Sequence, residues 1–162
     1  MAERQIKISV RNFVEFMLRS GDIDNRRHVS SENAMAEGGR IHRMIQRRMG
    51  SEYEAEVFLK YEEETPKYKL IIDGRADGII TVEQNVTIDE IKGTYRELEK
   101  IKKPQPVHLA QAKVYAYIYG KQKSVKNICV RMTYCNMDTE VLKYFIEEYT
   151  LAELEEWFQE LV

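Results

Sequence analysis

The 162-residue sequence lacks the features that mark membrane, secreted and multidomain chains. It has no secretory signal and no apolar run long enough to span a bilayer, so we expect a cytoplasmic chain with no membrane partner. Its two cysteines, Cys129 and Cys135, are interpreted as reduced thiols in or near a late strand. Without internal repeats, low-complexity tracts or a Pro/Gly-rich linker, residues 1–162 are predicted to form one domain.

Charge is strongly segregated along the chain although the net charge is only −2. Residues 51–99 carry 13 acidic and 6 basic side chains, whereas residues 100–126 carry seven basic and no acidic ones. Basic helices placed around acidic strands would attract a polyanion. Alternatively, a run such as Lys100, Lys102 and Lys103 is a solvated loop, as charge runs usually are.

The pattern of apolar residues predicts an α/β fold with a mixed β-sheet and helices on both sides. Helices are expected near residues 8–19, 31–49, 106–120 and 150–161, and strands near 54–62, 67–73, 75–83, 86–92, 125–134 and 138–145. The last helix carries large apolar residues that must pack against another surface. That surface is either a helicase that follows in a longer chain or, as the plainer alternative, the helix's own domain.

Two charged residues continue the apolar face of the strand expected at 86–92. Side chains alternate across a strand, so Glu90 and Lys92 share the face of Val86 and Ile88. Burying a carboxylate and an ammonium is costly unless they pair or bind a metal. This pattern therefore requires a partner.

The preceding strand supplies that partner in the form of Asp77. A two-residue hairpin loop that sets Glu83 opposite Val86 would set Asp77 opposite Lys92, on the face of Glu90. Diagonal neighbours in an antiparallel pair lie about 7–8 Å apart, close enough for two carboxylates to hold one cation. A loop one residue longer would break the arrangement.

Asp77 and Glu90 offer the oxygen ligands that Mg²⁺ or Mn²⁺ prefers. The ion would act as a Lewis acid and generate a nucleophile from water, while Lys92 would orient that water and offset charge on phosphorus. An isolated Glu-x-Lys pattern is too common to indicate this chemistry, so the neighbouring residues must decide.

A histidine lies in the middle of the apolar stripe of the helix at 31–49. Ser30 or Ser31 is the expected cap. The stripe consists of Met35, Gly38, His42, Ile45 and Met49. His42 is either a structural core histidine, the usual case, or a ligand brought close to the sheet by Gly38. A parallel arginine stripe contacts phosphates or is simply solvated; its members are Arg40, Arg43 and Arg47.

The helix at 106–120 presents His108, Gln111 and Tyr115 on one face, with Pro106 at its start and Gly120 as its expected end. Its tyrosines either stack on the bases of a single strand or, as we favour, act as half-buried spacers beside a packing stripe. That stripe would be Leu109, Ala112, Ala116 and Tyr119.

Four short motifs occur in the order found in a known nuclease family. They are Gly39-Arg40-Ile41-His42, the Gly-Arg-Ala-Asp at 74–77, the Asp-Glu-Ile-Lys at 89–92, and the Gln-x-x-x-Tyr at 111–115. Together they resemble the RecB-like branch of the PD-(D/E)xK nucleases, which includes CRISPR-associated RecB-like exonucleases. Residues 8–23 also resemble the start of RecB-like domains fused ahead of DinG/Rad3-type helicases.

The resemblance implies a restriction-endonuclease-like core and a metal-dependent DNA nuclease, acting as an exonuclease on single strands or ends. It implies His42, Asp77, Glu90 and the backbone carbonyl of Ile91 as ligands of Mg²⁺ or Mn²⁺. Lys92 would be catalytic with Asp77 and Glu90. Gln111 and Tyr115 would flank the site, and Glu56 is a further acidic neighbour that the family pattern does not fix.

The sequence departs from many of these relatives in its cysteines. Many of those relatives hold an iron–sulfur cluster with four cysteines. This sequence has only two, which cannot supply four ligands, so no cluster is expected. Two other functional classes remain open: a catalytically inactive nucleic-acid-binding module, and an interaction domain of a helicase that binds through the helix of Trp157. Neither needs Asp77, Glu90 and Lys92 to converge.

Overall fold

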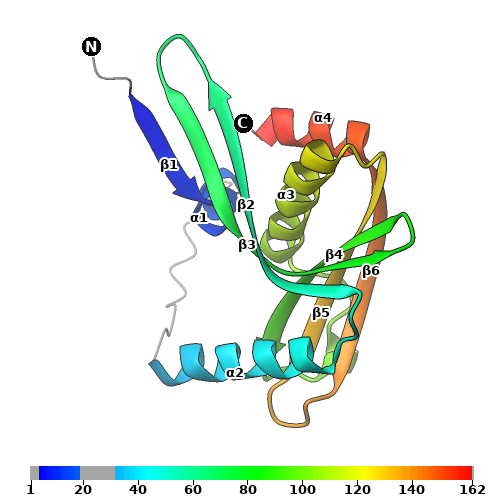
Figure 1. The fold of residues 1–162 in the computed structure, drawn as a ribbon. Coiled ribbons are helices and arrows are strands. Elements are labelled where there is room, and N and C mark those ends of the chain that lie inside the picture. Colours follow the sequence, from blue (N-terminus) through cyan, green and yellow to red (C-terminus); the bar gives the residue numbers. More distant parts are fainter. Residues whose placement is uncertain (1–3, 19–31, 162) are drawn as a thin grey trace.

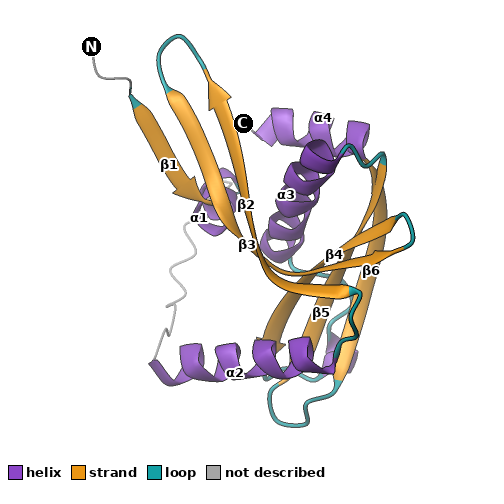
Figure 2. Ribbon diagram, in the orientation of Figure 1, coloured by secondary structure: helices purple, strands orange, loops and turns teal. Residues whose placement is uncertain are grey.

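The computed structural model describes residues 4–18 and 32–161, with side chains from residue 39 onward in the second segment. This part of the chain forms an α/β fold, a mixed six-stranded sheet flanked by four helices (Figures 1 and 2), as predicted. The strands are β1 (Gln5–Ser9), β2 (Tyr53–Glu64), β3 (Lys69–Val82), β4 (Asn85–Thr94), β5 (Asn127–Asn136) and β6 (Leu142–Thr150). The helices are α1 (Val10–Met17), α2 (Glu32–Arg48), α3 (Pro106–Lys123) and α4 (Leu151–Leu161), with a 3-10 turn at Leu98–Lys100.

The long strand β3 organises the sheet. β2 pairs antiparallel with it along residues 69–80, which occupies one edge. The other edge is shared: β1 pairs parallel with residues 69–73, and β4 pairs antiparallel with residues 78–82. Residues 74–77 of β3 therefore lie at a fork between β1 and β4. Beyond β4, β5 pairs parallel through the α3 crossover and β6 pairs antiparallel.

Several predicted element boundaries were wrong, including those of the last strand, expected at 138–145 and found as β6 at Leu142–Thr150. The helix expected at 8–19 begins only at Val10, because residues 5–9 form β1 and Ser9 caps the helix by accepting a hydrogen bond from the Asn12 amide. The strands expected at 67–73 and 75–83 are the single strand β3, since β2 pairs with both halves and Gly74 does not interrupt that ladder.

Most of the core lies on one face of the sheet, beneath α1, α3 and α4. α3 is its centre, and its residue Tyr117 is fully buried and stacks on Phe158 of α4 at 4.6 Å between ring centroids. Leu154 and Phe158 are fully buried, so α4 packs on its own domain, the plainer of the two alternatives. The burial of Tyr117 leaves its ring unable to stack on a base.

The opposite face of the sheet is covered by α2. Ile41 and Ile45 of this helix pack against Ile91 of β4 and Cys135 of β5, and all four side chains are fully buried. His42, predicted in the middle of the buried stripe, instead lies at its border, one position past Ile41. The predicted stripe members Met35 and Gly38, and the cap at 30–31, fall outside the residues or side chains described.

The ends of α3 also differ from the prediction in one respect. Pro106 is at the first turn as expected, but Gly120 remains inside the helix, which continues to Lys123 and ends at Ser124 in the left-handed conformation.

Both cysteines lie on β5 as free thiols. None of the helices in the described segments is long and apolar enough to cross a membrane.

Candidate metal centre

The candidate site forms where β1 and β4 separate along the edge of β3. Asp77 stands at the end of the stretch that neither β1 nor β4 pairs with, directly before Gly78, the first β3 residue that pairs with β4. An unpaired strand edge exposes backbone and side-chain groups that a ladder would otherwise occupy. The fork therefore leaves room for functional groups within the sheet.

The predicted register of the β3–β4 hairpin was wrong by two residues. The loop consists of Glu83 and Gln84, with Val82 opposite Asn85, and Glu83 adopts the positive φ of 57° that closes it. Continuing this register places Asp77 opposite Glu90 instead of Lys92. Because a shift of two residues preserves the alternation of faces, the prediction that these side chains converge does not depend on the error.

Asp77 is the centre of the site and is only 7% exposed. Its Oδ2 accepts a 2.7 Å hydrogen bond from the backbone amide of Ile91. Its Oδ1 lies 3.3 Å from Nδ1 of His42. One carboxylate oxygen is thus tied to the sheet while the other faces α2.

His42 is held in place by the packing of α2. Its neighbour Ile41 and, one turn on, Ile45 anchor the helix, and the His42 side chain remains 26% exposed. Burial alone would lower the pKa of His42, but the hydrogen bond to Asp77 and the charge of that residue prevail and raise it. The ring is therefore a partly accessible nitrogen donor that already faces a carboxylate.

Glu56 joins this group through an unusual backbone conformation. Ala55 pairs with Gly78 and Val57 pairs with Ala76, so Glu56 stands opposite Asp77, yet the ladder skips this pair. Glu56 has a φ of 56°, in the left-handed region that costs a non-glycine residue about 1–3 kcal/mol. Such strain is concentrated at functional sites.

Gln46, which was not predicted from the sequence, braces two members of the site. Its Nε2 donates a 3.0 Å hydrogen bond to Oε1 of Glu56 and a 2.9 Å bond to the backbone oxygen of Asp77. The signal was its spacing, since it follows His42 by four residues and shares its helix face. Gln46 thereby connects α2 to both β2 and β3.

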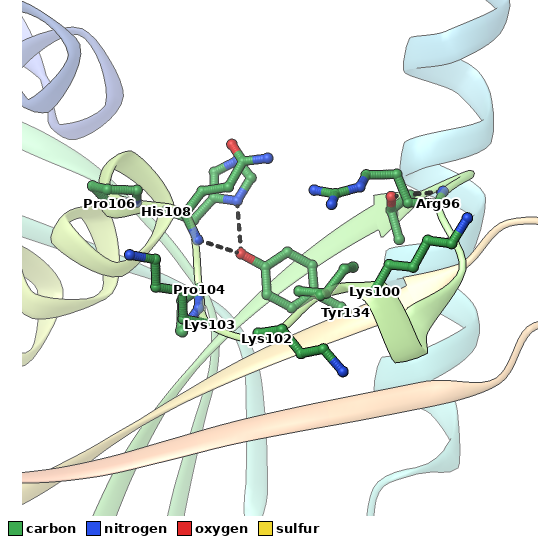
Figure 3. A pocket seen from close by; sticks show the side chains of 12 residues that line it. Arg96, Lys100, Lys102, Lys103, Pro104, Pro106, His108 and Tyr134 are labelled. Carbon is green, nitrogen blue, oxygen red and sulfur yellow. Dashed lines mark hydrogen bonds between the residues drawn. The ribbon is translucent and has the colours of Figure 1, made fainter.

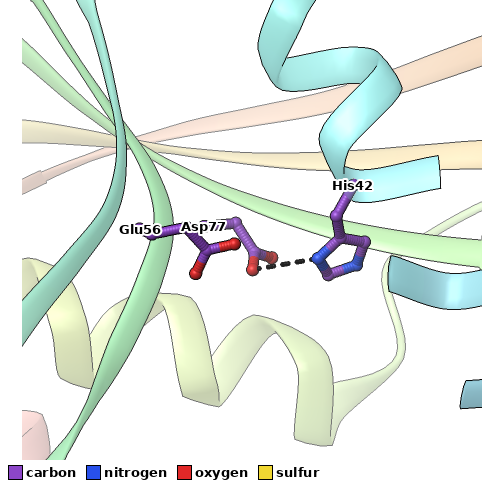
Figure 4. A group of neighbouring side chains, drawn as sticks. All are labelled: His42, Glu56 and Asp77. Carbon is purple, nitrogen blue, oxygen red and sulfur yellow. Dashed lines mark ion pairs between the residues drawn. The ribbon is translucent and has the colours of Figure 1, made fainter. Parts of the chain in front are cut away.

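The donor atoms of His42, Glu56 and Asp77 all lie within 4.8 Å of one another (Figure 4). One nitrogen and two carboxylate donors around a common space suit a divalent metal ion, whose bonds to carboxylate oxygens are about 2.0–2.6 Å long. In Figure 4 the His42 ring and the two carboxylates converge from α2, β2 and β3. The residues present fit such an ion.

Glu90 and Lys92 form a second group beside the first, and Glu90 does not belong to the tight cluster. Glu90 is 5% exposed, and its Oε1 lies 3.3 Å from Nζ of Lys92. Its Oε2 is buried without a hydrogen-bond partner among the described residues. Burial and the nearby charge of Asp77 raise the pKa of Glu90 well above its ordinary value. A cation or proton at this oxygen would relieve that cost.

The other predicted residues lie around these two groups. Tyr115 is buried with its hydroxyl against Gly74, in the fork of the sheet, and its pKa is raised by burial and by the charges of Glu90 and Asp77. Gln111 is buried, and its Oε1 also lacks a partner within the described part of the chain. The N–H and carbonyl of one strand residue point to the same side, so the Ile91 carbonyl is directed towards Asp77.

Asp89, which the acidic motif includes, has a separate structural role. It is fully buried, and Arg131 binds both of its oxygens at 3.0 and 3.1 Å. Thr133 and Tyr53 donate further hydrogen bonds to it at 2.5 and 2.7 Å. Asp89 is thus satisfied by protein donors, in contrast to Glu90 beside it.

No protein-family model matches the chain, and no curated protein sequence matches it. Among solved structures, the crystal structure of a protein named SSO0001 is similar, with a TM-score of 0.60 and 18% sequence identity. The match covers 99% of this chain and 77% of the other. At this identity the likeness concerns the fold alone.

Proposed function

We propose that the protein is a metal-dependent nuclease that hydrolyses phosphodiester bonds in DNA, as an exonuclease on single strands or ends. The observation that carries the proposal is the convergence of His42, Glu56 and Asp77 around one space, beside Glu90 and Lys92. These side chains come from four separate elements. A domain that only bound nucleic acid or another protein would have no need to bury Glu90 beside Asp77, at the cost that its raised pKa reflects.

The residues of the site suit the parts of this reaction. Mg²⁺ or Mn²⁺ held by His42, Glu56 and Asp77 would supply Lewis acidity at the phosphate. We assign Glu90, whose Oε2 has no hydrogen-bond partner among the described residues, the role of orienting the attacking water towards phosphorus. Lys92, 3.3 Å from the other oxygen of Glu90, carries the positive charge that offsets developing charge on the phosphoryl oxygens.

Tyr115 and Gln111 take supporting roles in this proposal. The Tyr115 hydroxyl is protonated at neutral pH, as an ordinary tyrosine is, so it is a hydrogen-bond donor beside the carboxylates, whose charges raise its pKa further. Gln111 Oε1, buried without a partner among the described residues, is a free acceptor on the same helix face. The exposed stripe Arg40, Arg43 and Arg47 on α2 adds positive charge near the site for a polyanionic strand. We also propose a cytoplasmic location and an associated helicase.

The test is cleavage of end-labelled single-stranded and duplex DNA by the purified chain in Mn²⁺, Mg²⁺ or EDTA. We expect cleavage that requires metal and that Glu90→Gln abolishes, because the amide cannot replace the carboxylate. Glu54→Gln, an exposed acid on the same sheet, is the matched control and should retain activity. Calorimetric titration with Mn²⁺ should show binding that Asp77→Asn removes.

The alternative function gives a different result in the same experiment. A catalytically inactive binding module would bind the labelled DNA equally in EDTA and in Mn²⁺ and would leave it intact. Absence of both cleavage and Mn²⁺ binding by the intact chain would overturn the proposal. Cleavage that Glu90→Gln left unchanged would place the catalytic centre elsewhere.

A further inference from the structure

A pocket with a volume of about 350 Å³ opens beside the candidate metal centre, between the end of β4 and the start of α3 (Figure 3). Four cationic side chains line it: Arg96, Lys100, Lys102 and Lys103. None of its lining residues, all within the described segment 32–161, is an aspartate or glutamate. The lysines that could equally have formed a solvated loop are therefore arranged around a concave space.

The start of α3 adds to the positive character of the pocket. Pro106 has no amide hydrogen, and within the described segments no side chain caps the helix, so the amides of Val107 and His108 have no intrahelical acceptor. The first turn of an 18-residue helix also carries the positive end of its dipole. Free amides and a positive potential at a helix start favour the binding of an anion such as phosphate.

The loop that carries the cations is fixed to the sheet by buried and backbone contacts. Lys143 of β6 donates to the backbone oxygens of Leu98 and Ile101 at 3.0 and 2.7 Å. Asn136 of β5 donates to the backbone oxygen of Arg96 at 3.1 Å. The cations are thus presented from a defined backbone, which reduces the conformational entropy that binding costs.

The rear wall of the pocket is an ordered hydrogen-bond network. The Tyr134 hydroxyl accepts a 3.1 Å hydrogen bond from the Gln105 amide and lies 3.1 Å from Nδ1 of His108 (Figure 3). A neutral His108 can accept through Nδ1 from the Tyr134 hydroxyl, which leaves the ring hydrogen on Nε2. Neither of these contacts involves a carboxylate, so the wall does not repel an anion.

The pocket and the metal centre are neighbours on the sheet. Lys92 of β4 lies opposite Tyr134 of β5, and parallel partners project to the same side. Gly93, which follows Lys92, lines the pocket itself. A strand whose phosphate lay at Glu90 and Lys92 would therefore extend towards the four cations.

We propose that this pocket binds a phosphate group of the nucleic-acid substrate strand while the adjacent phosphodiester lies at the metal centre. The inference deepens the proposed function and rests on it. A phosphate fits the pocket because it is an anion that uses several donors at once, from lysine, arginine and backbone amides together. If the bound group is a terminal phosphate, the pocket also measures the distance from the end of the strand to the bond that is cut.

The test compares two variants that remove the same amount of charge. The pocket variant carries Arg96→Gln, Lys100→Gln, Lys102→Gln and Lys103→Gln. The control variant carries Arg4→Gln, Lys67→Gln, Lys123→Gln and Lys126→Gln, all at exposed positions outside the pocket. Because all eight side chains are exposed, both variants should keep the fold, which thermal unfolding checks.

Binding of single-stranded oligonucleotides with a 5′-phosphate or a 5′-hydroxyl is measured by fluorescence anisotropy in EDTA at several salt concentrations. We expect the pocket variant to bind more weakly than the control, with a salt slope smaller by about 0.7 for each phosphate that the protein no longer neutralises. Inorganic phosphate should compete with the oligonucleotide for the wild-type chain more strongly than for the pocket variant. A 5′-phosphate preference that only the pocket variant loses identifies a terminal phosphate, whereas equal weakening for both oligonucleotides identifies an internal one.

Pocket and control variants that bind alike would overturn the inference, as would a wild-type chain that does not bind the oligonucleotides. Failure of the proposed function is distinguishable from this. In that case the wild-type chain would bind the strand through the pocket yet cleave nothing in Mn²⁺ or Mg²⁺. If the chain cleaves DNA while the pocket variant matches the control in binding and cleavage, the proposed function stands and the phosphate pocket does not.

Discussion

The backbone amide of Ile91 donates a 2.7 Å hydrogen bond to Oδ2 of Asp77, across the point where β3 and β4 part. Ile91 has no backbone partner on β3. The carboxylate of Asp77 accepts the hydrogen bond that such a partner would otherwise accept. The same carboxylate presents its other oxygen to His42. Asp77 therefore has both a structural and a functional role, and substitutions can separate them.

Asp77→Asn should remove Mn²⁺ binding and leave stability nearly unchanged. The amide oxygen of asparagine can still accept from Ile91, but the loss of the negative charge weakens the attraction for a divalent cation. Asp77→Ala should in addition lower the free energy of unfolding by about 1–3 kcal/mol, since it leaves the buried Ile91 amide unpaired. Calorimetry and urea denaturation of the two variants measure these effects. Equal stability of Asp77→Ala and wild type would contradict the structural role.

Gln46→Ala should weaken Mn²⁺ binding by about 10–100-fold although Gln46 is not a ligand. Its side chain holds Glu56 and the backbone of Asp77 together, and loss of a group that orients metal ligands typically has this effect. Gln84→Ala, the same substitution at the exposed turn between β3 and β4, should not change the affinity. Calorimetric titration of both variants with Mn²⁺ measures the affinities. An unchanged affinity in Gln46→Ala would show that Glu56 keeps its position without the hydrogen bond from Gln46.

Asp89→Ala should lower the free energy of unfolding by about 3–5 kcal/mol, because it leaves the guanidinium of Arg131 partly buried without its partner. Tyr53→Phe removes a single donor to the same carboxylate and should cost about 1.5–3 kcal/mol. Both are measured by chemical denaturation in EDTA. A cost for Asp89→Ala no larger than that for Tyr53→Phe would argue against Asp89 as the centre of this network.

Gly74→Ala should destabilise the fork of the sheet, and Tyr115→Phe should relieve part of that loss. A Cβ at position 74 would lie 2.5 Å from the Tyr115 hydroxyl oxygen, so the two residues cannot both keep their positions. In a double-mutant cycle of unfolding free energies we expect a coupling of about 0.5–3 kcal/mol. Additive effects would show that the Tyr115 ring moves away without cost.

The stability of the protein should fall as the pH decreases from about 6.5 towards 4, in part because of His108. Burial, together with the charges of Lys92 and Arg11, lowers the pKa of His108 from 6.5 to about 4. Between these values the unfolded chain binds a proton that the folded chain does not, so unfolding becomes easier as the pH falls. Replacing His108 by a residue that does not titrate removes this contribution.

His108→Gln is the variant that isolates the effect. We expect its free energy of unfolding, relative to wild type, to rise by about 3 kcal/mol between pH 6.5 and pH 4. Urea denaturation at half-unit steps of pH measures this difference, in which the other titrating groups cancel. Parallel stability curves for the two proteins would show that His108 titrates normally.

Local rules predicted much of the site from the sequence. Alternation along β4 put Glu90 and Lys92 on one face, and this is independent of tertiary structure. The convergence of Asp77 with Glu90 followed from the alternation of side chains between the two faces of the sheet. An error of two residues in the hairpin register does not change which face a side chain is on. The α/β class followed from the order of helical and extended patterns.

Other features depend on contacts between distant segments and have no local signal. β1 exists because β3 offers it an edge, and the continuity of β3 depends on the full length of β2. The left-handed conformation of Glu56 and the reach of Gln46 to Asp77 arise only when α2 and β2 meet at the fork. Helix periodicity puts Gln46 on the face of His42, but that spacing does not indicate a contact with Glu56 or Asp77.

The sequence by itself determined the fold class, the chemical character of the acidic strands and the run of lysines after them, because these depend on composition and on short periods. Only the tertiary structure decided which donors share a space and that Arg96 and the lysines after it enclose a pocket next to Lys92. The physical reason is that coordination and binding depend on distances across the sheet. Those distances are set by strand pairing between segments far apart in the chain.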